Sequence, residues 1–94
     1  MIKYIINVVY SKTDIYGNRY SYATLTSAAT GKSITLQSGY GENQLKYWLA
    51  RKEVNLEQLS ASESEIGIRD FNRQTKNMKF WRENELSAIL ASLN

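Results

Sequence analysis

The sequence predicts a small α+β domain in which an antiparallel β-meander of three to five strands carries two helices packed on one face. Residues 2–10 and 19–28 are rich in β-branched and aromatic residues, and turn-forming residues lie between them at 14–18. Residues 42–52 and 83–93 place apolar side chains at helical spacing. The chain has 94 residues, enough for one hydrophobic core, so residues 1–94 are treated as a single domain.

The first predicted element is a long antiparallel hairpin made by residues 2–10 and 19–28. In the first strand alternate residues form an apolar face, and the opposite face is half apolar as well. In the second strand Tyr20 and Tyr22 share one face. Apolar or aromatic surface on both sides favours helices on one face and a partner, or a second copy, on the other. The alternative is that the chain itself covers both faces.

A second turn at residues 29–32 leads into a third, shorter strand at residues 33–38. Residues 31–33 (Gly-Lys-Ser) match the end of a P-loop. However, Thr26 stands where that motif needs its first glycine, and a strand rather than a helix is predicted to follow. Nucleotide binding at this turn is therefore excluded.

Residues 39–41 (Gly-Tyr-Gly) are predicted to end the third strand, and a helix is predicted over 42–52. Leu45, Trp48 and Leu49 lie along one side of this helix. The second helix, over 83–93, has an apolar stripe of its own: Leu86, Ile89, Leu90 and Leu93. Both stripes are expected to pack on the sheet.

The segment between the two helices carries weaker signals. Asn55 can cap a short turn, and the Ser- and Glu-rich residues 60–64 are predicted to form an exposed loop. Residues 65–71 alternate in polarity and are predicted as a fourth strand. Residues 72–77 are polar and basic, and the aromatic residues of 78–81 either dock on the core or form a short fifth strand.

Composition excludes several classes of chemistry. The chain has no cysteine, histidine or proline, so disulfides, thiolate or imidazole metal sites and proline-rich ligands are absent. We expect no metal and no cofactor. The N-terminus lacks the pattern of a signal peptide and no apolar run approaches the width of a bilayer, which predicts a cytoplasmic protein that does not contact membranes.

Catalysis is also disfavoured by composition. Without histidine or cysteine, an enzyme would depend on paired carboxylates or on a hydroxyl activated by lysine. Asp14, Glu42 and Asp70 are candidates for such a role, but acidic residues at turns and helix starts commonly serve as caps. We therefore expect a protein that is not an enzyme.

Charge is unevenly distributed along the chain, although the net charge is only +3. Residues 53–65 hold four glutamates and no basic residue, whereas residues 69–82 hold five basic residues and one aspartate. Such blocks can steer a charged partner. The simpler interpretation is that the blocks are solvated faces, or that they pair with each other.

Two classes of function fit these features. Seven tyrosines exceed what so small a core can bury, and tyrosine and arginine are enriched at protein interfaces. This favours a small protein-binding module, a stoichiometric inhibitor or adaptor, of the kind found among small phage or mobile-element proteins that block host or defence machinery. That analogy is one of size and composition, without a family motif. The alternative is a nucleic-acid-binding protein that uses the basic aromatic segment 69–82.

The predicted contact residues come from the hairpin and the basic segment, because both combine exposure with directional contacts. The expected partner is another protein with an acidic surface, with nucleic acid or a second copy of the chain as alternatives. The predicted partner-binding residues are Tyr16, Tyr20, Tyr22, Arg69, Arg73, Lys76 and Lys79.

Overall fold

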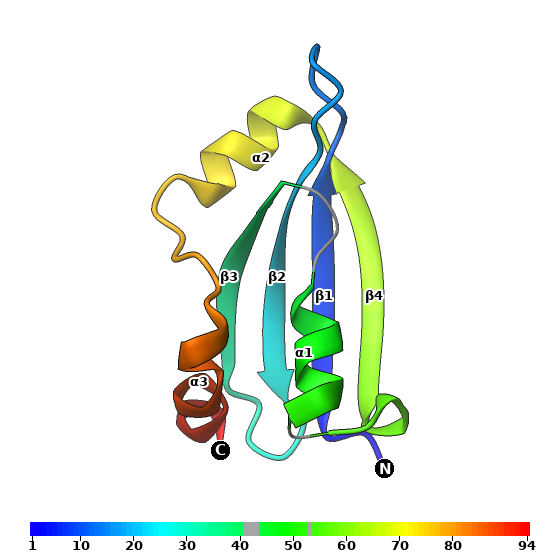
Figure 1. Cartoon of the computed structure of the whole chain (residues 1–94), viewed down its shortest axis with the longest axis vertical. Helices are drawn as coiled ribbons and strands as arrows, with labels where there is room; N and C mark the ends of the chain where they lie inside the picture. Colours follow the sequence, from blue (N-terminus) through cyan, green and yellow to red (C-terminus); the bar gives the residue numbers. More distant parts are fainter. Residues whose placement is uncertain (41–43, 53) are drawn as a thin grey trace.

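A computed structural model describes residues 1–40, 44–52 and 54–94 (Figure 1). The four strands form one sheet in the order β3-β2-β1-β4, and the predicted α+β class is confirmed. The elements along the chain are β1 (Tyr4–Ser11), β2 (Tyr20–Ser27), β3 (Ser33–Tyr40), α1 (Leu45–Lys52), the 3-10 turn η1 (Leu56–Gln58), β4 (Leu59–Ile66), α2 (Ile68–Thr75), the 3-10 turn η2 (Glu83–Glu85) and α3 (Leu86–Leu93).

The first three strands form the predicted antiparallel meander, with β2 between β1 and β3. Gly17 and Gly31 sit in the two turns with φ of 82° and 76°, a conformation that only a residue without Cβ adopts freely. Gly39, with φ of 78°, does not end β3 as predicted. It lies beside a register shift between β2 and β3, and the strand continues to Tyr40.

The fourth strand differs from the prediction. β4 covers the residues predicted as a loop at 60–64, and it runs parallel to β1 rather than antiparallel. The helix α1 makes this possible, because it returns the chain to the end of the sheet where β1 starts. Asn55 caps η1 just before β4, as predicted, and it accepts a hydrogen bond from the Gln58 backbone N–H at 3.2 Å.

The predicted strand over 65–71 was wrong as well. Ile66 ends β4, Gly67 is the N-cap, and Ile68 begins the helix α2. Phe71 and Thr75, four residues apart, are the buried positions of this helix. The alternation of two isoleucines around a glycine thus spans the boundary between a strand and a helix.

The core lies between one face of the sheet and the helices α1 and α3. Both predicted apolar stripes are confirmed: Leu45 and Leu49 of α1 are fully buried, and Trp48 packs partly against the core. The predicted start of the first helix, residues 42–43, lies outside the described residues. The remaining core residues come from the strands, α3 and the segment before β4: Tyr4, Ile6, Val8, Tyr10, Ala23, Leu25, Leu36, Val54, Leu59, Leu86, Ile89, Leu90 and Leu93.

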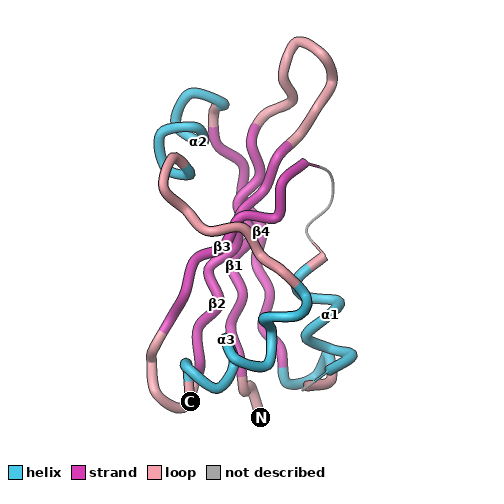
Figure 2. The backbone as a smooth tube through the Cα atoms, turned by 60° about the vertical axis from the view of Figure 1, so that its left-hand side comes forward, coloured by secondary structure: helices cyan, strands magenta, loops and turns pink. Residues whose placement is uncertain are grey.

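The helix α2 lies on the opposite face of the sheet, so the expectation of two helices on one face omits this third helix. Figure 2 views the sheet nearly edge-on, with α1 on one side and α2 on the other. The ring of Phe71 packs 6.4 Å from that of Tyr20 and 5.6 Å from that of Tyr22. At this end the chain itself covers the second face.

A polar side chain on β3 fixes the end of α2. The Gln37 amide donates hydrogen bonds of 2.9 Å to the carbonyl oxygen of Thr75, the last residue of α2, and to that of Met78 in the turn that follows. The backbone of Gln37 also bonds to the segment after α2, by donating to Lys79 and accepting from Trp81. The aromatic residues of 78–81 are therefore held at this edge, where Phe80 forms an isolated bridge to β3 and Trp81 packs against the core.

A second polar cluster ties α3 to the opposite end of the sheet. Asn94 donates from Nδ2 to the Tyr4 hydroxyl at 2.7 Å and to the Leu90 carbonyl at 2.9 Å, and it accepts from the Ser27 hydroxyl. Tyr4 and Ser27 are buried. The cluster satisfies polar groups that would be costly to leave unpaired inside the protein.

Candidate interaction surface

The hairpin tip and α2 project from the same end of the molecule (Figures 1 and 2). The chain is elongated, with extents of 40 × 25 × 23 Å, and the β1–β2 loop stands at one end of the long axis. The helix α2 starts directly after β4 at that end. The fold thereby brings together residues 12–19 and residues 68–76, with residues 20–67 between them in the sequence, and we call these two stretches the tip end.

The loop at the tip end is ordered by one side chain. Asp14 Oδ1 accepts hydrogen bonds from the backbone N–H groups of Tyr16 at 2.9 Å and Asn18 at 2.8 Å. The backbone of Asp14 also accepts from Gly17 and donates to Asn18. These bonds close the loop, which leaves Ile15 91% exposed and Tyr16 82% exposed. Two large side chains are thus held in solvent on a fixed turn.

Tyr20 and Tyr22, also predicted as contact residues, have a different position. Both are half-buried beneath α2, against the 3%-exposed Phe71. The Tyr22 hydroxyl donates to the Gln74 side chain, and partial burial raises the pKa of this phenol. The two tyrosines form the surface against which α2 packs, so they hold α2 in place at the tip end.

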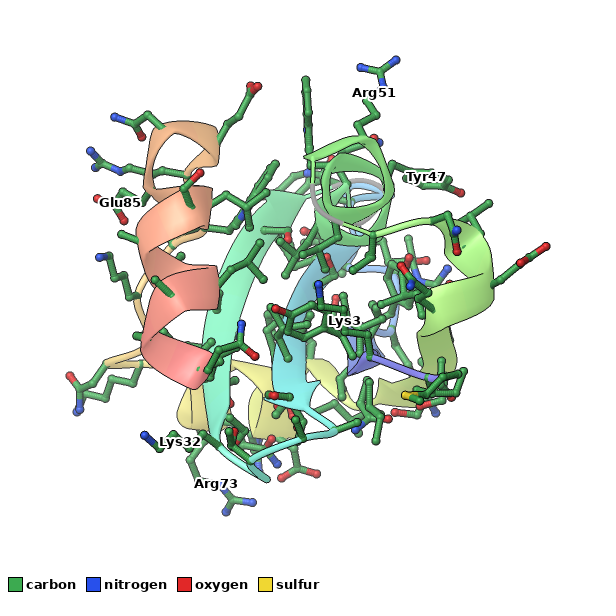
Figure 3. All side chains as sticks on the ribbon, turned by 90° about the horizontal axis from the view of Figure 1, so that it is seen from below. Lys3, Lys32, Tyr47, Arg51, Arg73 and Glu85 are labelled. Atoms are coloured by element: carbon green, nitrogen blue, oxygen red, sulfur yellow. The ribbon has the colours of Figure 1, made fainter. Side chains whose placement is uncertain are left out.

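Three of the predicted basic residues lie exposed on α2 or at its end, namely Arg69, Arg73 and Lys76. The Arg73 guanidinium pairs with Asp70 at 2.7 Å. Within the described ranges 1–40, 44–52 and 54–94, Arg69 and Lys76 have no ion-pair partner. Figure 3 shows Arg73 and Arg51 projecting in opposite directions, Arg51 from the α1 side of the molecule. The tip end therefore carries positive charge that the described part of the chain does not pair.

Lys79 does not join this group. It lies on the segment that pairs with the edge of β3, and its ammonium is 2.8 Å from the Glu85 carboxylate. The hydrogen bond from Lys79 lowers the pKa of Glu85 below its ordinary value. Lys79 thus holds this segment against η2, which is a structural role.

Sequence reasoning missed two cations that flank the tip. Lys12 is exposed, and Arg19 stacks its guanidinium 4.1 Å from the centre of the Tyr10 ring while pairing with Glu65 at 3.3 Å. In the sequence, the feature that points to these two residues is their position next to the predicted hairpin turn. The described ion pairs do not join the acidic block to the basic block, because the partner of Glu65 comes from the hairpin.

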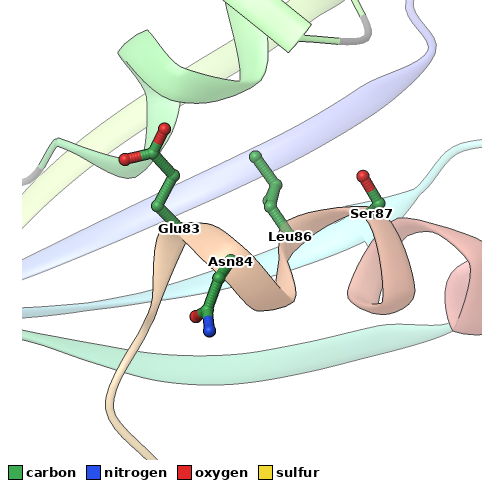
Figure 4. Close-up of a pocket in the computed structure, with 4 residues that line it drawn as sticks. All are labelled: Glu83, Asn84, Leu86 and Ser87. Atoms are coloured by element: carbon green, nitrogen blue, oxygen red, sulfur yellow. The ribbon is translucent and has the colours of Figure 1, made fainter.

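The acidic candidates for catalysis have structural partners. Asp14 caps the tip loop and Asp70 pairs with Arg73, whereas Glu42 lies outside the described residues. Among the described residues, no group of three or more acidic side chains could hold a metal ion. A hollow of about 530 Å³ lies at the start of α3 and is lined by Glu83, Asn84, Leu86 and Ser87, whose side chains are drawn in Figure 4. Glu83 is the one ionisable group among these four, so they supply no acid–base pair.

No protein-family model, curated protein or solved structure matches the chain. The described helices include none with the length and hydrophobicity needed to cross a lipid bilayer.

Proposed function

We propose that the protein is a small non-catalytic binding module that acts as a stoichiometric inhibitor or adaptor and contacts a partner protein through its tip end. The observation that carries this proposal is the pair of exposed side chains, Ile15 and Tyr16, on a loop closed by Asp14. Large side chains that enter a partner's pocket supply most of the energy of many interfaces. A loop that is already ordered loses less conformational entropy on binding.

The charges around the loop indicate the kind of partner. Lys12, Arg69 and Lys76 are exposed at the tip end and lack ion-pair partners in the described part of the chain. An apolar anchor with a cationic rim is complementary to an apolar pocket with an acidic rim. Charges at a rim mainly increase the association rate and the selectivity. The proposed partner is thus a protein with an acidic surface.

Nucleic acid is the second candidate, and the same unpaired cations support it. Two features weaken it. Phe71, an aromatic residue of the basic segment 69–82, is buried under α2 and cannot stack on a base. In addition, Asp14 and Asp70 lie among the cations, which reduces the attraction for phosphate.

Affinity capture tests the proposal. The tagged protein is incubated with a lysate of the cells that produce it, with and without nuclease, beside the variant Ile15→Ser/Tyr16→Ser. The matched control is Tyr47→Ser, because Tyr47 is a second exposed tyrosine, on α1 (Figure 3). We expect a stoichiometric protein that survives nuclease, is lost with the tip variant and is kept by the control.

Two results would contradict the proposal. One is a captured protein that the tip variant retains at the wild-type level, with the fold of the variant confirmed by circular dichroism. The other is capture that disappears with nuclease, which would favour the nucleic-acid alternative.

A further inference from the structure

The two edge strands of the sheet, β3 and β4, have different surroundings. On the β3 edge, the backbone of Gln37 donates to Lys79 at 2.8 Å and accepts from Trp81 at 2.7 Å. On the other side the sheet ends with β4, and no described segment pairs with its outer edge (Figure 1). Every residue of β4 from Ser60 to Glu65 is exposed. A described segment therefore pairs with part of the β3 edge, whereas the outer edge of β4 has no pairing segment among the described residues.

The open edge is long and regular. β4 pairs with β1 in a single register, from Leu59 opposite Tyr4 to Ile66 opposite Ser11. It contains no proline and no bulge, and its length of 8 residues corresponds to about 26 Å. Half of its backbone N–H and C=O groups point away from β1, and such a row is a template for another strand. Natural sheets usually block it with lysine, proline or a bulge.

The exposed side chains of β4 are small or acidic. Ser60, Ser62 and Ser64 lie on the face that α2 partly covers, and Ala61, Glu63 and Glu65 lie on the other. Small residues leave the backbone accessible, and the ionisable groups of the strand are both acidic. Glu65 pairs with Arg19, but both side chains are nearly half exposed (47% and 45%), so the pair is weak and exchangeable.

We propose that β4 is the docking edge for an extended segment of a partner protein with lysine or arginine at every second position, which adds a fifth strand to the sheet. This inference rests on the proposed function and adds a second contact to it: the acidic surface of the partner meets the tip end, and a separate basic segment of the same partner pairs with β4, which ends where α2 begins. The backbone supplies the affinity and the alternate basic side chains supply the selectivity.

A second copy of the chain fits this edge less well than a basic segment. It would bring its own Glu63 and Glu65 to the same face, which places four carboxylates on two neighbouring strands. Like charges on neighbouring strands destabilise a sheet. The basic segment instead places a cation beside each carboxylate.

Synthetic peptides of about the length of β4 test the inference. The probe alternates lysine with threonine, and two controls replace every lysine by glutamate or methylate every central backbone nitrogen. Binding is followed by NMR of the intact isotope-labelled protein. We expect the basic peptide to shift and protect alternate amides of β4, and each control to bind about tenfold more weakly or worse, because one loses the charge match and the other the backbone bonds. Glu63→Lys/Glu65→Lys should reverse the preference between the lysine and glutamate peptides.

The inference is overturned if the basic peptide shifts amides elsewhere, or if the methylated peptide binds as well as the parent, which would mean charge attraction alone. It is also overturned if sedimentation shows a dimer that Glu63→Lys dissociates or strengthens, since a second copy would then occupy the edge. Tip variants should leave peptide binding unchanged. Peptide binding without any captured protein would refute the proposed function alone, and captured protein without peptide binding would refute the strand-addition inference alone.

Discussion

Replacing Phe71 by alanine should detach α2 from the sheet. Phe71 is 3% exposed and packs on Tyr20 and Tyr22. Truncating a buried phenylalanine costs roughly 3–5 kcal/mol, and the half-buried tyrosines can relax, so we expect about 3 kcal/mol. A chain of this length is stable by about 5–14 kcal/mol, and the loss should lower Tm by roughly 12–24 °C.

Urea denaturation and hydrogen exchange together test this expectation. The urea midpoint should fall in Phe71→Ala, and amides of α2 should lose more protection than those of β1 and β2, because α1 and α3 still cover the main core. The control is Tyr22→Phe, which removes only an exposed hydroxyl bond to Gln74 and should cost at most about 1 kcal/mol. An unchanged midpoint, or equal loss of protection in all strands, would refute the placement of Phe71 as the residue that docks α2.

Three further predictions concern polar contacts. Asn94→Ala should cost about 1–3 kcal/mol in urea denaturation, because it leaves the buried hydroxyl groups of a tyrosine in β1 and a serine in β2 without their partner. The pKa of Glu85 is lowered by Lys79, so the pair stabilises the fold fully above the ordinary glutamate pKa and is lost as the pH falls through the lowered pKa. The acid side of the stability curve should therefore be flatter in Glu85→Gln than in the wild type. Arg69→Glu/Lys76→Glu should weaken an acidic protein partner selectively, whereas for nucleic acid it should weaken all sequences and reduce the salt slope by about 2.

Much of the fold could be predicted from local patterns. The meander and the helices over 42–52 and 83–93 have strong alternation or helical spacing, because each buries one face in the core. β4 has no such signal, since it is an exposed edge strand of serines and glutamates whose pairing with β1 depends on backbone bonds. The helix α2 was missed for a related reason: it buries only Phe71 and Thr75, and its other positions are mostly polar.

The positions of the candidate contact residues in the fold could be predicted in part. Tyr16 lies at the hairpin tip, where turn residues place it, and Arg69, Arg73 and Lys76 share that end because α2 starts directly after β4. Sequence reasoning could not tell that Tyr20 and Tyr22 lie beneath α2, because the helix itself was not predicted. The covered position of Phe71 depends on the same helix.

Hydrogen exchange of the protein in complex with its captured partner tests the central claim most directly. The claim is that the tip end makes the contact. The account predicts slower exchange at residues 12–19 and 68–76, with the exposed surface of α1 unchanged. Protection confined to α1 or to the hollow at the start of α3, with residues 12–19 and 68–76 exchanging as in the free protein, would contradict it.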